Sequence, residues 1–358
     1  MRGMSLAPSG DMTRRMKAAV FEATRTIGLN RRVGASAWRR QRLLILCYHG
    51  ISLHNEHEWN PRLFISPENF SRRLELLDRS GCTVVPLGEA VQRVYANEIP
   101  ERAVCLTFDD GFYDFAVQAQ PRLRQFGFPA TVYLNTLRCG HDFPAVRIGL
   151  SYVFWKSKRS VVDGRGLPGL DPVEYPIATP EQRWTLAVAI HTSLLAAKAD
   201  VARQDDALRD VSQRMGVDYD ELASTRMLSL MRPAEVTALA AEGVDFQMHT
   251  HRHSTPVDSD LFVEEIRENR WRIEAMTGVR PTHFCYPSGL YRESYFPLLE
   301  AAGVVTATTT RAGMVSSKTS PLLLPRFVDM NSVSEAEFDG WLTGIAPWLA
   351  DVTRYRPA

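Results

Sequence analysis

Two short stretches of this sequence carry side chains suited to catalysis. The first, T-F-D-D-G at residues 107–111, places two adjacent carboxylates where an apolar run ends. The second, H-T-H-R-H at residues 249–253, holds three of the nine histidines directly after another apolar run. Adjacent carboxylates repel unless a cation lies between them or one of them holds a proton. Imidazoles two or four residues apart can present their nitrogens to one metal. Each stretch alone is also compatible with a solvated turn, but together they predict a metal site.

Two imidazoles and one carboxylate, with positions left open for water and substrate, form a known type of hydrolytic metal site. One carboxylate would join His249 and His253 on the metal, and the other would take a proton from the attacking water. A separate acid must protonate the departing amine, and a backbone N–H would complete an oxyanion hole. This division of roles is what hydrolysis of an amide requires.

The order of the two motifs, about 140 residues apart, makes the chain resemble the polysaccharide deacetylase family with the NodB homology domain, also called carbohydrate esterase family four. Both T-F-D-D-G and H-[ST]-x-x-H are intact. The resemblance implies that Asp109 is the general base and that Asp110, His249 and His253 hold the metal. It also implies that the substrate is an amino-sugar polysaccharide or oligosaccharide, from which N-acetyl groups are removed as acetate.

A third stretch, F-C-Y-P-S-G at residues 284–289, departs from the family motif R-x-P-Y. Cys285 occupies the arginine position and Ser288 the tyrosine position. The backbone N–H of Ser288 can still serve the oxyanion, because that role needs no particular side chain.

Two further residues are candidates for roles that the motifs leave open. Arg326, in L-P-R-F near the end of the last apolar run, is a candidate for holding Asp109 in place of the missing arginine. We do not find the family's late leucine-x-histidine motif, which supplies the general acid. His49, in L-C-Y-H-G-I, resembles the tyrosine-histidine element of the exopolysaccharide-type branch and is our candidate for the acid or a substrate contact. A structural histidine is the alternative.

The elements that must position these residues are apolar runs alternating with helical patterns. The runs predict strands buried on both faces, at 43–49, 103–108, 129–135, 244–249, 283–287, 304–308 and 322–327. Helical patterns lie between most of them, at 66–77, 113–126, 232–242, 258–277, 291–302 and 333–347. This alternation predicts a parallel sheet, and seven strands predict an incomplete (β/α)7 barrel.

Three regions are predicted in the chain. Residues 41–350 form the barrel, with a helical insertion at 140–230 that shows no clear strands. Residues 1–40 form a basic N-terminal arm, since residues 1–42 hold ten Lys or Arg against two acidic residues. Met16, Val20, Ala23 and Ile27 recur there at helical spacing. The arm is either a partly frayed, solvated leader or a segment that lies on an anionic membrane surface or a partner.

Composition limits the kind of protein, the partners and the compartment that the sequence allows. A hydrophobic fraction of 45% over 358 residues indicates a packed globular protein, and a net charge of +1 argues against nucleic acid as a partner. The five cysteines are scattered without a C-x-x-C pair, which suits a reducing compartment. No signal peptide is recognisable. We therefore expect a cytoplasmic protein, with the inner membrane surface as an alternative location.

The predicted cofactor is one divalent metal, with Zn²⁺ as the default and Co²⁺, Ni²⁺ or Mn²⁺ as alternatives. The rival functions are hydrolysis of a small cyclic amide or ureide on the same fold, and binding of metal or glycan without turnover. A third alternative gives the basic arm the main role, as a module that recruits the chain to lipid or to an assembly.

Overall fold

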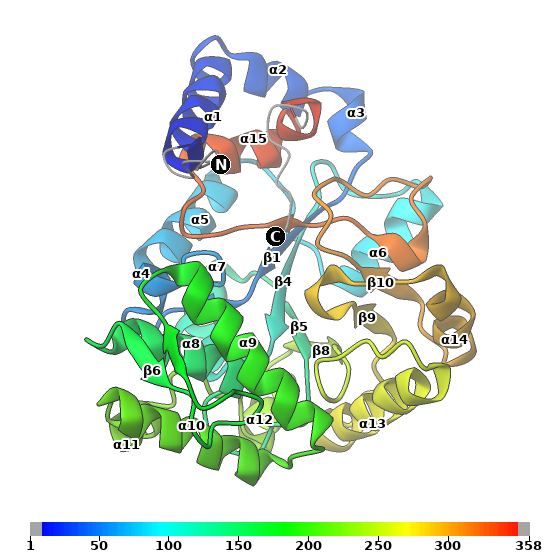
Figure 1. Ribbon diagram of the computed structural model, residues 1–358. Coiled ribbons are helices and arrows are strands. Elements are labelled where there is room, and N and C mark those ends of the chain that lie inside the picture. The colour runs from blue at the N-terminus through cyan, green and yellow to red at the C-terminus, as the bar shows by residue number, and fades with distance from the viewer. Residues whose placement is uncertain (1–8, 350–358) are drawn as a thin grey trace.

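A curved sheet of seven parallel strands forms the centre of the molecule (Figure 1). The computed structural model describes residues 9–349. The strands are β1 (Leu44–Tyr48), β4 (Val104–Asp110), β5 (Thr131–Leu134), β8 (Asp245–Met248), β9 (His283–Cys285), β10 (Thr306–Thr308) and β11 (Phe327–Val328). Their order across the sheet is β10-β9-β8-β5-β4-β1-β11. A single bridge from Thr308 to Leu324, just before β11, links the two edges. The predicted incomplete (β/α)7 barrel is confirmed.

Side chains of the central strands alternate between two layers. Every residue of β1 and β4 is buried, as expected of parallel strands covered on both faces. Leu44 and Leu46 pack in one core cluster, whereas Ile45 and Cys105 pack in another that also holds residues of β5 and β9. Because side chains alternate along a strand, Asp109 lies on the same face of β4 as Cys105. The strand period therefore directs Asp109 into the barrel.

Helices cover the outer face of the sheet. Ser66 begins the first covering helix, where its hydroxyl accepts from the Asn69 N–H at 3.2 Å and Pro67 occupies the first helical turn, as the sequence predicts. A π-helical turn, Phe115–Ala119, precedes α7 within the range predicted as one helix. The barrel helices, including these two, are α5 (Pro67–Arg79), α6 (Leu87–Ala96), α7 (Gln120–Phe126), α12 (Pro233–Ala241), α13 (Ser259–Thr277), α14 (Phe296–Ala301) and α15 (Glu335–Thr343).

The last strand differs from the prediction. The range 322–327 was expected to be a strand, but Pro321–Leu323 form a 3₁₀ turn and β11 begins only at Phe327. Leu324 pairs with β10, while Phe327 pairs with β1. Pro325 between them has no N–H to donate, so the ladder is interrupted there and the chain changes neighbours. The residue at this change of neighbour is Arg326.

The insertion contains more than helices. It comprises α8 (Val146–Lys156), α9 (Pro180–Ala196), α10 (Val201–Met215) and α11 (Tyr219–Ser224), and also an antiparallel pair, β6 (Val161–Asp163) and β7 (Glu174–Pro176). The prediction that this region lacks strands is wrong. Only Val162 is buried in β6, and a three-residue strand is too short to show a recognisable alternating pattern.

The N-terminal residues form three helices instead of a frayed leader in the part of the chain that is described. These are α1 (Ser9–Thr26), α2 (Leu29–Gly34) and α3 (Ala37–Arg40), and the first two pack on α15. Phe21 is 1% exposed. The fully buried Arg39 donates to the carbonyls of Leu342, Arg42 and Arg102. Among residues 9–349, no helix combines the length and the apolarity needed to cross a bilayer.

Candidate active site

Asp110, His249 and His253 converge where two neighbouring segments leave the sheet. Asp110 is the last residue of β4, and His249 directly follows β8. Their ligand atoms and that of His253 lie within 4.8 Å of one another. Asp110 and His253 have positive φ angles of 72° and 53°, which are uncommon for residues with a side chain and recur at functional sites. The structure thus brings together the three residues predicted to hold the metal.

The geometry of this trio fits a cation. The Oδ1 atom of Asp110 lies 3.3 Å from Nε2 of His249 and 3.1 Å from Nε2 of His253. This oxygen is buried and has no hydrogen-bond partner among the described residues. Nδ1 of His249 lies 2.8 Å from the Cys285 carbonyl, so in the neutral ring Nδ1 carries the proton and donates, and Nε2 keeps its lone pair. A buried oxygen and two imidazole nitrogens this close together are a donor set that could hold one metal ion.

Buried amides hold the backbone of the candidate metal ligands in place. The Asn269 side chain accepts from the His249 N–H at 2.9 Å and donates to the Leu134 carbonyl. The Asn135 side chain donates to the Asp110 carbonyl at 2.9 Å. His251, predicted to be a bystander, lies outside the trio.

The His251 ring turns toward Thr136 at 2.9 Å and toward Glu268. Burial lowers the pKa of His251 to about 4, so the ring is neutral at neutral pH.

Asp109 is held by Arg326. Two guanidinium nitrogens donate to the two carboxylate oxygens, both at 2.7 Å, and the same side chain donates to Thr107 and to the Thr309 carbonyl. Asp109 is 3% exposed and Arg326 is fully buried. Burial alone would raise the pKa of Asp109, but the Arg326 charge outweighs it and holds that pKa below the usual range. The pairing predicted from sequence is therefore present, with bidentate geometry.

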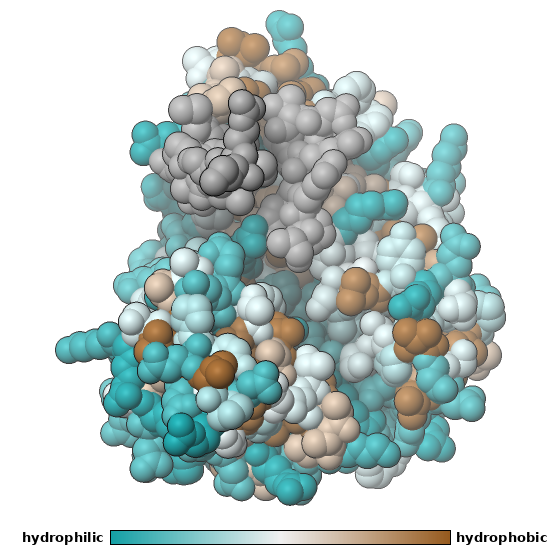
Figure 2. Space-filling view, in the orientation of Figure 1, coloured by the Kyte–Doolittle hydropathy of each residue, from teal (hydrophilic) through white to brown (hydrophobic). Residues whose placement is uncertain are grey.

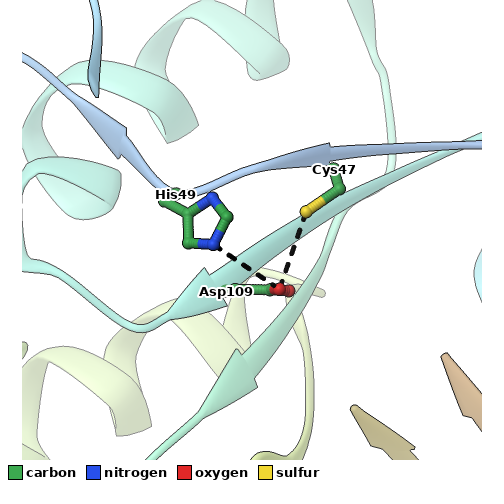
Figure 3. A group of neighbouring side chains, drawn as sticks. All are labelled: Cys47, His49 and Asp109. Atoms are coloured by element: carbon green, nitrogen blue, oxygen red, sulfur yellow. Dashed lines mark hydrogen bonds and ion pairs between the residues drawn. The ribbon is translucent and has the colours of Figure 1, made fainter. Parts of the chain in front are cut away.

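Cys47 on β1 and His49 directly after it point toward Asp109 (Figure 3). His49 Nε2 lies 3.9 Å and Cys47 Sγ 3.6 Å from Asp109 Oδ2. Burial lowers the pKa of His49, although the Asp109 and Asp110 charges oppose the shift. The same trio has the residue types of a second metal site. A cation there would lie beside the Arg326 guanidinium, so charge repulsion argues against one.

Among the predicted site residues, Ser288 makes no described contact with the others. It lies in the 3₁₀ turn Pro287–Gly289 with φ 57°, and its side chain is exposed. The turn begins two residues after Cys285, whose carbonyl accepts from His249. Ser288 is therefore near the end of a strand that contacts the candidate metal ligand His249, but no described contact joins it to Asp109 or Asp110.

The insertion contributes residues that the motifs did not indicate. The Ala145 N–H donates to the Leu228 carbonyl at 2.8 Å, and Leu230 bridges to Phe112 just after the T-F-D-D-G motif. This fixes the start of α8 beside the site. There, the partly buried Arg147 stacks on Trp184 at 5.1 Å, and the Asp110 charge opposes the lowering of its pKa by burial. No carboxylate pairs with this guanidinium among residues 9–349. A lone arginine in an insertion offers no sequence signal.

Comparisons with known proteins agree with this geometry. Residues 197–307 match the family model for polysaccharide deacetylases. YxkH of Bacillus subtilis (strain 168), whose name places it provisionally among these enzymes, is 31% identical over 111 residues. Within this segment the chain is therefore similar to polysaccharide deacetylases. The match to YxkH covers 30% of this chain and 38% of that protein, so it spans little more than a third of its length.

Solved deacetylase structures share the fold of this chain. The Streptococcus pyogenes deacetylase PplD, solved in complex with acetate, is similar with a TM-score of 0.53 and 18% identity, over 83% of this chain and 96% of that one. IcaB from Ammonifex degensii has a TM-score of 0.52 and 17% identity, over 86% and 96%. At these identities the likeness concerns the fold, and it extends over the barrel beyond the segment that the family model matches.

Proposed function

We propose that this chain is a metal-dependent hydrolase that removes N-acetyl groups from N-acetylglucosamine-type units of a polysaccharide or glycan intermediate and releases acetate. One observation carries the proposal. A buried oxygen of Asp110, without a hydrogen-bond donor, faces Nε2 of both His249 and His253, beside the arginine-bound Asp109. The reaction class is supported by the relatives, of which PplD is described as a deacetylase in complex with acetate.

The donor set suits one divalent metal. We propose Zn²⁺, with Co²⁺, Ni²⁺ or Mn²⁺ as alternatives, because one carboxylate and two imidazoles leave positions open for water and substrate. Such an ion, when bound, polarises the acetyl carbonyl and makes the attacking water more acidic. Asp110, His249 and His253 would hold it, and the Cys285 carbonyl keeps the His249 ring in the orientation that ligation needs.

In this proposal Asp109 and His49 carry out the proton transfers. Arg326 keeps Asp109 ionised, so Asp109 can accept the proton of the attacking water. A carboxylate with so low a pKa is a weak base and gives the proton up readily. His49 is our candidate for the group that takes the proton and delivers it to the leaving amine, because it lies 3.9 Å from Asp109 and burial lowers its pKa, which favours the neutral ring. The Ser288 N–H is our candidate for the oxyanion contact.

We also propose a cytoplasmic location and a glycan partner, with no nucleic acid. The location rests on the scattered free cysteines, and the exclusion of nucleic acid rests on the near-zero net charge. Neither inference depends on the metal site.

Binding without turnover is the second candidate function. Arg326 engages both oxygens of Asp109, and the carboxylate is 3% exposed, which is the arrangement of a buried structural ion pair as well as of a restrained base. This observation favours a protein that binds metal or glycan and releases no product.

Acetate release decides between the candidates. Protein stripped by a chelator and resupplied with one equivalent of Zn²⁺ or Co²⁺ would be assayed on N-acetylglucosamine oligomers. We expect metal-restored release, loss of both metal and release in His249→Ala, and normal behaviour in the control His141→Ala. Asp109→Asn should retain about one metal per chain while turnover falls by about 10²–10⁴.

The opposite results are equally informative. Full activity in Asp109→Asn would refute the assignment of the base. Tight binding of one metal and of the oligomer without acetate, in the wild-type protein, would favour the binding function. Turnover of a cyclic ureide in place of the oligomer would favour the small-amide hydrolase.

A further inference from the structure

The helix α1 carries apolar residues on a face that no described residue covers. Met16 and Val20 on α1, and Ile27 directly after its end, are 64%, 36% and 71% exposed, and with the exposed Ala23 they recur every three or four residues. The Ile27 N–H donates to the Ala23 carbonyl, so Ile27 continues the last helical turn. This spacing aligns them in one stripe along the helix. Phe21, which is 1% exposed, lies on a different face against α15. The helix therefore has two apolar faces: the one with Phe21 packs on the barrel, and the exposed stripe does not.

Two unpaired arginines lie on the helix next to this apolar stripe. Of the eight Lys or Arg between residues 15 and 42, Arg39 is buried, and Lys17 and Arg40 pair with Glu337 and Glu101. Glu22 is bound by Arg25. Arg31 and Arg32 on the adjacent α2 are exposed and have no carboxylate partner among residues 15–349, whose side chains are described. An apolar helix face bordered by excess positive charge is complementary to an anionic lipid surface, where apolar side chains enter the interface and arginines meet the headgroups.

The position of the stripe is compatible with catalysis on a surface-bound enzyme. Arg40, at the end of α3, leads directly into β1, so the N-terminal helices lie near the amino ends of the strands. Asp110 and His249 lie at the carboxyl ends of β4 and β8. In Figure 1 these helices and the insertion occupy opposite ends of the molecule, and Figure 2 shows hydrophobic surface at the outer tip, over the end of α1 and α2. Contact at that tip leaves the site facing away from the surface.

We propose that α1 and α2 dock this protein on an anionic phospholipid surface. The apolar stripe of α1, defined by Met16, Val20, Ala23 and Ile27, enters the interface, and Arg31 and Arg32 contact the headgroups. The docking is independent of the deacetylase proposal, because none of these residues lies in the candidate active site.

Vesicle co-sedimentation tests the docking with the full-length protein. Vesicles of phosphatidylglycerol and phosphatidylcholine in equal amounts would be compared with vesicles of phosphatidylcholine alone, at low salt and at high salt. One variant is Met16→Ser/Val20→Ser/Ile27→Ser, and a second is Arg31→Gln/Arg32→Gln. The control variant, Val263→Ser/Trp271→Ser/Val279→Ser, removes three large apolar residues exposed on and just after α13.

The wild-type protein and the α13 control should bind the anionic vesicles and dissociate at high salt. The stripe variant should lose binding on the order of tenfold, and the arginine variant roughly tenfold. All variants should release acetate from a soluble oligomer at the wild-type rate, which separates a failure of docking from a failure of the proposed reaction.

Three results would overturn the docking proposal. The first is an absence of wild-type binding to anionic vesicles, and the second is equal binding by the stripe variant and the wild-type protein. The third is a concentration-dependent dimer in light scattering that the stripe variant abolishes, because a second copy would then be the occupant of the stripe.

Discussion

Replacing Arg326 by methionine should lower the free energy of unfolding by about 3–5 kcal/mol near neutral pH, the usual cost of removing one partner of a buried ion pair. The structure supports that magnitude. Two charge-assisted hydrogen bonds of 2.7 Å are lost, each worth roughly 1.5–3 kcal/mol, and Asp109 stays buried without a counter-charge. Methionine fills much of the volume of arginine, so the loss reports mainly the charge.

The pH dependence of this deficit tests its cause. In the wild-type protein the pKa of Asp109 lies below its unfolded value of about 3.9, so the pair stabilises the fold above that pH and is lost as the pH falls through the folded pKa. Without Arg326, burial raises the pKa of Asp109 above the unfolded value. The variant then loses stability as the pH rises toward that raised pKa. The deficit should therefore grow between about pH 4 and pH 7.

Urea unfolding at several pH values, with a chelator present throughout, measures this deficit. The double variant Asp109→Asn/Arg326→Met serves as the control, because it removes the buried charge together with its partner and should be more stable at pH 7 than Arg326→Met alone. A deficit below about 1 kcal/mol would show that the pair carries little stability, contrary to the reasoning from burial. A deficit that does not change with pH would show that lost packing, not the Asp109 charge, is the cause.

Two further predictions concern the surroundings of the site. Gly111 has a φ of +81°, and an added Cβ would lie 2.2 Å from a Leu134 side-chain carbon. In Gly111→Ala we therefore expect the free energy of unfolding to fall by about 2 kcal/mol or more, and acetate release to fall with it. An unchanged melting temperature would show that the alanine causes no strain. In Arg147→Gln, we expect a several-fold higher KM for the glycan at unchanged metal content, because the guanidinium has Trp184 as its described partner and remains available to substrate. The exposed Arg203→Gln in the same insertion is the matched control, and an equal KM in both variants would exclude a substrate contact.

The barrel could be predicted because its strands are continuous apolar runs separated by helical patterns, and because local signals such as Ser66 before Pro67 mark helix starts. The last strand could not be placed correctly. The apolar run at 322–327 satisfies the pattern, but Pro325 divides it between two neighbouring strands. The apolar pattern shows which side chains can be buried, whereas the end of a strand depends on which backbone N–H groups can donate to the neighbouring strand.

The N-terminal segment shows a different limit. The spacing of Met16, Val20 and Ile27 correctly indicates a helix, yet these residues lie on its exposed side and Phe21 makes the buried contact. A periodic pattern identifies an apolar stripe and cannot show whether another element covers it. For the same reason the sequence alone left a loosely held leader and a docked helix open.

In the site, motif spacing was sufficient for residues that share strand ends. Asp109 and Asp110 end β4, His249 follows β8, and parallel strands present their carboxyl ends at one edge. Arg147 could not be found in this way. Its position depends on the hydrogen bond from the Ala145 N–H to the Leu228 carbonyl, because the nearby Leu230 pairs with Phe112 just after the T-F-D-D-G motif.

The substitution of Cys285 for the motif arginine does not remove the guanidinium from the site. Arg326 reaches Asp109 from the segment before β11, and the Cys285 sulfur lies 3.1 Å from its Nη2 atom and 3.4 Å from Asp109 Oδ2. Inside a barrel, side chains from different strands can reach the same point, so a role can pass from one strand to another. The thiol of Cys285 is small enough to leave space for the guanidinium of Arg326, which comes from the segment before β11. A degenerate third motif is therefore weak evidence for lost activity in this chain, because the contact that the motif normally provides is present.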